Sequence, residues 1–113
     1  MIRELKQQPE IFKHINAPCY YFQVEKDNRI FCWIAVHDEG PVAGVHVEVE
    51  SWTNVVRKQL ESDWESLKDI LRSKGITALY ATNSEHENKQ WIRFINLFGF
   101  GDPIVISISY QEI

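Results

Sequence analysis

The sequence predicts a single α/β domain of the α+β type, built on one mixed sheet, from three observations. Residues 19–50 hold three runs rich in aromatic and β-branched residues, joined by short turns, and such runs favour an antiparallel three-strand meander. Residues 54–73 repeat apolar residues at helical spacing. Residues 76–110 then alternate strand, helix and strand. A long helix between two strands requires a crossover, which is right-handed in nearly all proteins and makes the sheet mixed.

Length and composition limit the classes of protein that this chain can belong to. Its 113 residues fit one domain, residues 1–113, with one core and at most one site. The 44% of hydrophobic residues is too high for a disordered chain. A net charge of -4 disfavours binding to nucleic acid phosphates. Because no apolar run approaches the roughly 20 residues of a membrane span and the N-terminus lacks a secretion signal, we expect no membrane partner and a cytoplasmic protein.

The first expected element is a short helix over residues 8–15. Pro9 suits a first helical turn, and Pro18 ends the segment. The apolar residues at helical spacing are Ile11, Phe12 and Ile15.

The first hairpin is expected to turn at residues 27–28. In that register Cys32 faces Gln23 and Cys19 faces Val36, so a disulfide between the two cysteines would need a different register. Without a CxxC spacing or a nearby histidine pair, both cysteines are expected to be buried free thiols, and a cysteine nucleophile is the less favoured alternative.

The second and third strands differ in the faces they are expected to bury. Residues 30–36 are nearly all apolar, which is typical of a strand covered on both faces and places it in the centre of the sheet. The third strand alternates, which predicts one buried and one polar face. Its apolar side consists of Ala43, Val45, Val47 and Val49, and its polar side of His46, Glu48 and Glu50.

The long helix is expected from about Asn54 to Ser73, roughly 30 Å in length, with Gly75 where a helix stop is needed. Its apolar stripe consists of Val56, Leu60, Trp64, Leu67 and Leu71, supported by Ile70. Residues 76–81 predict a short strand. A second helix ending at Gly99, with Trp91, Phe94, Ile95 and Phe98 on its apolar side, and a last strand over 103–110 complete the chain.

This order of elements resembles the second half of the GNAT (Gcn5-related N-acetyltransferase) family, over roughly residues 20–110. The residues that carry the resemblance are Gly75-Ile76 between helix and strand, Asn88 at the start of the last helix, and Gly99-Phe100 at its end. The resemblance implies a GNAT-like mixed sheet and an acetyl-CoA site, in which backbone amides at the start of the long helix hold the pyrophosphate. The cofactor-binding positions that it implies are Val55, Val56, Arg57, Lys58 and Asn88.

Three departures from the family pattern predict that this acetyl-CoA site is degenerate. The family opens its long helix with a glycine-rich loop that lets phosphate approach the amides, whereas residues 53–60 contain no glycine. Ile95 stands where the family commonly has a tyrosine that protonates the leaving thiolate, and isoleucine has no proton to give. The chain also lacks the family's first strand and ends one strand early. Arg57 and Lys58 can alternatively form a solvated helix face.

The polar face of the third strand holds the candidates for a general base. GNAT enzymes often place such a base on this strand, and Glu48 is the first candidate, followed by His46. The alternative is that these side chains only form the water-facing side of the strand. His46 is expected beside Trp33 across the hairpin. Neither interpretation involves a metal.

One asparagine and the four tryptophans also have predicted roles. Asn88 can contact the cofactor or cap the last helix. Trp33 and Trp64 are expected in the core, and Trp91 at the start of the last helix. Trp52 follows the polar strand and is the best candidate for a contact with a protein partner.

These expectations lead to three hypotheses of function. Short GNAT-like proteins of tailed bacteriophages, of the head-assembly or internal virion type, resemble this chain in the spacing of residues 91–100. The first hypothesis is a GNAT-like protein that needs no cofactor and acts through protein contacts, as an accessory in phage head assembly or DNA delivery. The alternative is an acetyl-CoA-dependent N-acyltransferase with an atypical cofactor loop, and a sensor that binds acetyl-CoA without chemistry is the third possibility. The oligomeric state, the partner and the acceptor substrate stay open.

Overall fold

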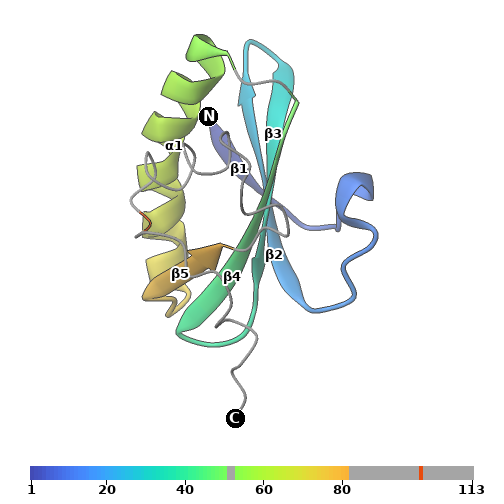
Figure 1. Ribbon diagram of the computed structural model, residues 1–113, viewed down its shortest axis with the longest axis vertical. Coiled ribbons are helices and arrows are strands. Elements are labelled where there is room, and N and C mark those ends of the chain that lie inside the picture. The colour runs from blue at the N-terminus through green and yellow to red at the C-terminus, as the bar shows by residue number, and fades with distance from the viewer. Residues whose placement is uncertain (51–52, 82–99, 101–113) are drawn as a thin grey trace.

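The computed structural model describes residues 1–50, 53–81 and 100. Within these residues it has an α+β fold with a mixed sheet, as expected (Figure 1). The described sheet has five strands, and one α-helix is described with it. The strands lie in the sheet in chain order. They are β1 (Ile2–Leu5), β2 (Cys19–Lys26), β3 (Arg29–His37), β4 (Val42–Val49) and β5 (Ala78–Ala81). Neighbouring strands from β1 to β4 are antiparallel, whereas β5 is parallel to β4. The expected second helix and last strand lie outside the described residues.

The central strand β3 is covered on both faces, as its apolar sequence predicts (Figure 1). Helix α1 (Asn54–Ser73) packs on one face, and the segment around the 3-10 helix η1 (Glu10–Phe12) covers the other. The larger core cluster joins the sheet to α1, and its largest side chains are Phe22, Phe31, Ile34, Leu60, Trp64, Leu67 and Leu71. The smaller cluster, under η1, consists of Phe12, Ile15, Tyr21 and Ala35.

Helix α1 has the bounds that its sequence predicts, because both ends carry local stop signals. The Thr53 side chain caps the first turn, and Gly75 adopts a φ of 86°, which glycine tolerates best. The Ile76 amide then donates to the Leu71 carbonyl and satisfies an end of the helix. Trp64 is buried in the core as expected, and the Phe100 ring lies edge-on against it.

The N-terminal part of the chain differs from expectation in two respects. A strand, β1, precedes the meander, where no strand was expected. Its four residues carry no strand pattern of their own; pairing with β2 makes them a strand. The helix expected over residues 8–15 is only η1, because the amides of Phe12 and Ile15 donate to carbonyls three residues back rather than four. The Gln8 side chain also donates to the carbonyls of Phe12 and Ile15.

The first hairpin turns at residues 27–28 as expected, with positive φ at both, but the expected register is wrong. Val24 pairs with Cys32 while Glu25 pairs with Ile30, so Phe31 forms a bulge. The bulge places Phe31 in the cluster under α1 and shifts every later pair by one residue.

The polar strand β4 alternates as predicted: its four apolar residues belong to the cluster under α1, and His46 and Glu48 lie on the other face. His46 pairs with Ala35, and Trp33 pairs with Glu48. The expected contact of His46 with Trp33 is therefore wrong, because the β3–β4 register differs by two residues from the expected one. Trp33 is only partly buried, against the smaller cluster.

Candidate functional site

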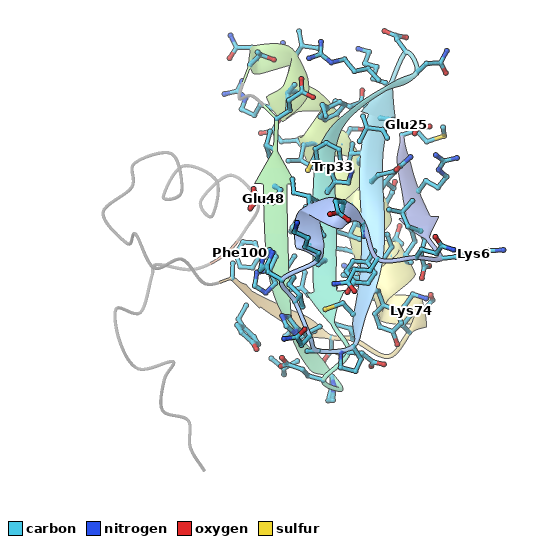
Figure 2. All side chains as sticks on the ribbon, turned by 90° about the vertical axis from the view of Figure 1, so that its right-hand side faces the viewer. Lys6, Glu25, Trp33, Glu48, Lys74 and Phe100 are labelled. Carbon is cyan, nitrogen blue, oxygen red and sulfur yellow. The ribbon has the colours of Figure 1, made fainter. Side chains whose placement is uncertain are left out.

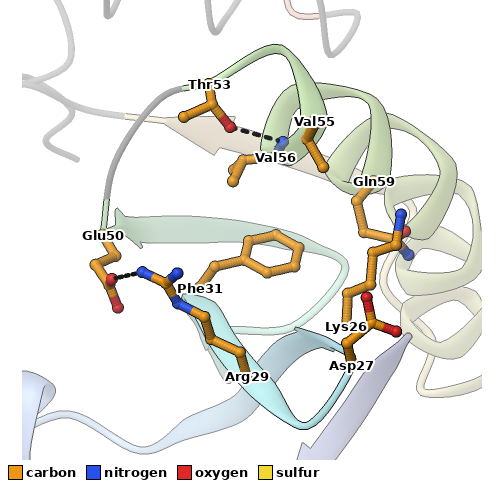
Figure 3. Close-up of a pocket in the computed structure, with 9 residues that line it drawn as sticks. All are labelled: Lys26, Asp27, Arg29, Phe31, Glu50, Thr53, Val55, Val56 and Gln59. Atoms are coloured by element: carbon orange, nitrogen blue, oxygen red, sulfur yellow. Dashed lines mark hydrogen bonds and ion pairs between the residues drawn. The ribbon is translucent and has the colours of Figure 1, made fainter.

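A pocket of about 430 Å³ lies between the β2–β3 hairpin and the start of α1 (Figure 3). The hairpin and the residues around its bulge form one wall, and the first two turns of the helix form the other. The residues that line the pocket are Lys26, Asp27, Arg29, Phe31, Glu50, Thr53, Val55, Val56 and Gln59.

The charges around this pocket balance. Arg29 forms an ion pair with Glu50 across the mouth, and Lys26 and Asp27 follow each other in the hairpin (Figure 3). Two cations and two anions therefore line the same space, while the Phe31 ring supplies an apolar surface between the hairpin and the helix. A highly charged anion gains little from such a lining, because the carboxylates oppose the basic groups.

The start of α1 has only part of its backbone available for a ligand. The Val56 amide donates to Thr53 Oγ1 at 3.1 Å, and the Arg57 amide donates to the Thr53 carbonyl at 2.9 Å. Among the described residues, none accepts from the amides of Asn54 and Val55. Two amides therefore point out of the helix, and the carboxylate of Glu50 lines the same pocket. This lining does not fit a CoA pyrophosphate well.

Replacing Thr53 by alanine is expected to lower the unfolding free energy by about 1 kcal/mol, because the Val56 amide loses its acceptor. Urea unfolding measures this loss. Thr53→Ser is the control, since it keeps the hydroxyl and should stay within about 0.5 kcal/mol of the wild type. Equal unfolding midpoints of the two variants would show that the cap contributes nothing.

Only some of the five positions expected to bind the cofactor line this pocket. Val55 and Val56 line the pocket. Arg57 and Lys58 do not, and the Arg57 Nε atom is buried without a hydrogen-bond partner in the described part of the chain. Asn88 lies outside the described residues, as does Trp52, the expected partner contact.

The two expected catalytic residues lie on β4 and do not line this pocket. Glu48 is exposed opposite Trp33 (Figure 2), and its side chain forms no hydrogen bond or ion pair with the described part of the chain. His46 is half-buried, and its Nε2 atom lies 2.7 Å from Nε2 of His37. Because neither residue lines the pocket, the described residues do not bring the expected base and the expected cofactor positions into one site.

His46 belongs to a network that joins β4 to β5. His37 Nδ1 lies 3.7 Å from Glu39 Oε1, and Tyr80 Oη donates to the Glu39 carboxylate at 2.9 and 3.1 Å. The Tyr80 ring lies over Gly44, where a Cβ atom would come within 2.9 Å of it. Glycine at position 44 therefore allows the tyrosine to cross β4 and reach Glu39.

This environment changes the acidity of two of its members. Burial is the main cause that lowers the pKa of His46, with help from His37 and His14, while Glu48 opposes them. Burial, together with the hydrogen bond and charge of Glu39, raises the pKa of Tyr80. At neutral pH we therefore expect a neutral His46 and a protonated Tyr80.

The sequence interpretation missed His37 and Glu39, and it assigned Tyr80 no role. The signal for His37 was its position at the end of an apolar strand, one hairpin away from His46. Only the β3–β4 register could place the two rings together. The pocket residues Lys26, Asp27 and Arg29 were missed because they belong to the turn of a hairpin, where charged residues are common.

Both cysteines are free, as expected. Cys32 is buried, and burial raises its pKa well above the usual range. Cys19 is half-buried opposite His37, and burial raises its pKa although a hydrogen bond with Tyr21 opposes the shift. Neither thiol has the lowered pKa of a nucleophile.

Within residues 1–50, 53–81 and 100, no three histidine, cysteine or acidic side chains are arranged to hold a metal ion. The helix in this part of the chain is too polar to cross a membrane. Comparison with known protein families, curated proteins and solved structures finds no match.

Proposed function

We propose that this chain is a GNAT-like domain that does not acetylate and that acts through protein contacts, as an accessory in phage head assembly or DNA delivery. The phage part of the proposal rests on the resemblance of residues 91–100 to short phage proteins. The non-catalytic part rests on the described pocket and the described side chains of β4.

The observation that carries the proposal is the lining of the pocket at the start of α1. A cofactor pyrophosphate would need several free amides and no nearby carboxylate. Here Thr53 occupies one amide, and Asp27 and Glu50 line the same space. The separation of Glu48 and His46 from this pocket supports the same conclusion, because an acyl transfer needs its base beside the thioester.

The same pocket supports a role in protein contact. Val55 is 62% exposed at its edge, and Val56 and Phe31 add apolar surface. Balanced charges around an apolar centre are usual at protein interfaces. We therefore propose that a protein partner contacts the start of α1; the expected contact residue, Trp52, precedes this helix in the sequence.

Titration calorimetry with acetyl-CoA and with CoA tests the non-catalytic part, and we expect no binding tighter than about 1 mM. Micromolar binding that is lost in Val55→Asp and kept in Ser66→Asp would overturn the proposal in favour of the acyltransferase or the sensor. Ser66 is the matched control because it is exposed on the same helix but does not line the pocket.

Site-specific photo-crosslinking in the cells that produce the protein tests the contact. A benzoylphenylalanine at position 55 is expected to give one distinct crosslinked protein, and the same group at position 66 is expected to give none. Equal patterns from the two positions would contradict a contact at the start of α1.

A further inference from the structure

The rings of His37 and His46 meet nitrogen to nitrogen across strands β3 and β4. Their Nε2 atoms are 2.7 Å apart, and their ring centroids are 4.9 Å apart. The difference of 2.2 Å is about two ring radii, so the two nitrogens lie nearly on the line that joins the centroids. A shared metal ion would need both lone pairs to converge on a third point, with Zn–N bonds of about 2.0–2.1 Å. The contact is therefore a hydrogen bond with one proton between the rings.

Titratable side chains from the neighbouring elements lie around this histidine pair. Glu39, in the turn after β3, lies near His37 Nδ1, and Tyr80 of β5 donates to Glu39. Cys19 of β2 lies opposite His37. On the side of His46, the electrostatic neighbours are His14, from the segment after η1, and Glu48 of β4.

A hydrogen bond between two imidazoles needs one donor and one acceptor. A neutral ring supplies the acceptor, whereas a protonated ring has N–H groups at both nitrogens. If both rings are protonated, the pair has no acceptor and places two cations in contact at a half-buried position. The contact can therefore persist only while at least one ring is neutral.

We propose that the His37–His46 pair is an acid-sensitive contact, which holds β4 against the end of β3 at neutral pH and opens when both imidazoles are protonated. Protonated His37 is a cation beside the Glu39 carboxylate, which accepts from Tyr80 of β5, so protonation of the pair also acts on this link to β5. Strand β5 pairs with β4 over only four residues. We therefore expect loss of the His37–His46 bond to weaken the sheet most on its β4–β5 side.

The direction of the pH effect follows from proton binding. Because the folded state lowers the pKa of His46, the unfolded chain binds more protons as the pH falls through the ordinary histidine range near 6.5. Stability is therefore constant above this range and is lost as the pH falls below it.

The test compares urea unfolding at pH 7.5 and pH 5.0 in the wild type and in three variants. The ratio of folded to unfolded wild type is expected to be lower at pH 5.0 than at pH 7.5, because the folded state lowers the pKa of His46. The His46→Gln and His37→Gln variants should show much less of this decrease, because with one imidazole left the pair cannot become doubly charged. His14→Gln is the control and should keep most of it. A full pH effect in both pair variants would overturn the proposal.

A second measurement does not depend on the variants folding. The ring nitrogens of the wild type are followed by NMR from pH 8 to pH 4.5. A shared proton predicts coupled titration, in which the His46 nitrogens respond also to the protonation of His37. Two independent single-step titrations would overturn the proposal.

Discussion

Replacing Leu67 by alanine is expected to lower the unfolding free energy by about 3 kcal/mol. Leu67 has no exposed surface and lies on the α1 face that packs against the sheet, beside Leu60, Trp64 and Leu71. Alanine removes the buried methyl groups and leaves a cavity that the sheet and the helix can fill only in part. Since domains of this size are stable by about 5–15 kcal/mol, the loss is a large share of the total.

Urea unfolding followed by tryptophan fluorescence measures this effect. Ser66→Ala is the matched control, because Ser66 is the exposed neighbour on the same helix and should change the free energy by less than about 0.5 kcal/mol. A loss below about 1 kcal/mol for Leu67→Ala would mean that α1 does not pack on the sheet as described.

Replacing Phe12 by alanine is expected to cost about 3 kcal/mol as well, although Phe12 lies in a helix of only three residues. Its side chain is 1% exposed, and its ring stacks on Tyr21 with the centroids 6.1 Å apart. The ring is the main cover of the sheet face opposite α1, so its loss would expose Tyr21 and Ala35 to water.

The neighbouring Ile11 gives the control for this prediction, because it is 40% exposed and outside the cluster. Ile11→Ala should cost clearly less than Phe12→Ala in the same unfolding measurement. Similar losses for the two variants would indicate that η1 is not packed on the sheet.

Those parts of the fold that rest on local periodicity could be predicted. The bounds of α1 follow from a 3.6-residue apolar repeat between a threonine cap and Gly75, and the alternation of β4 follows from a two-residue repeat. The central place of β3 follows from its apolar composition. Each of these signals lies within one element, so no knowledge of the partner element is needed.

The errors lie where a distant partner decides the outcome. Strand β1 exists because β2 offers it an edge. The segment that contains η1 is held by bonds from the Gln8 side chain to the carbonyls of Phe12 and Ile15. The bulge at Phe31 forms in the hairpin where this ring reaches the cluster under α1. That bulge moved the partners of Cys19 and Cys32 by one residue.

Some features of the candidate site could likewise be predicted from the sequence, and others could not. By itself, the sequence determined a chain with an amphipathic helix whose start lacks glycine, and a strand with His46 and Glu48 on one face, because residue type and spacing along one element settle both. The tertiary structure alone decided that Val55 and Val56 line a pocket that excludes those two residues, and that His46 meets His37. The physical reason is that strand register and the packing of a helix on a sheet depend on contacts between residues far apart in the chain, which no local pattern encodes.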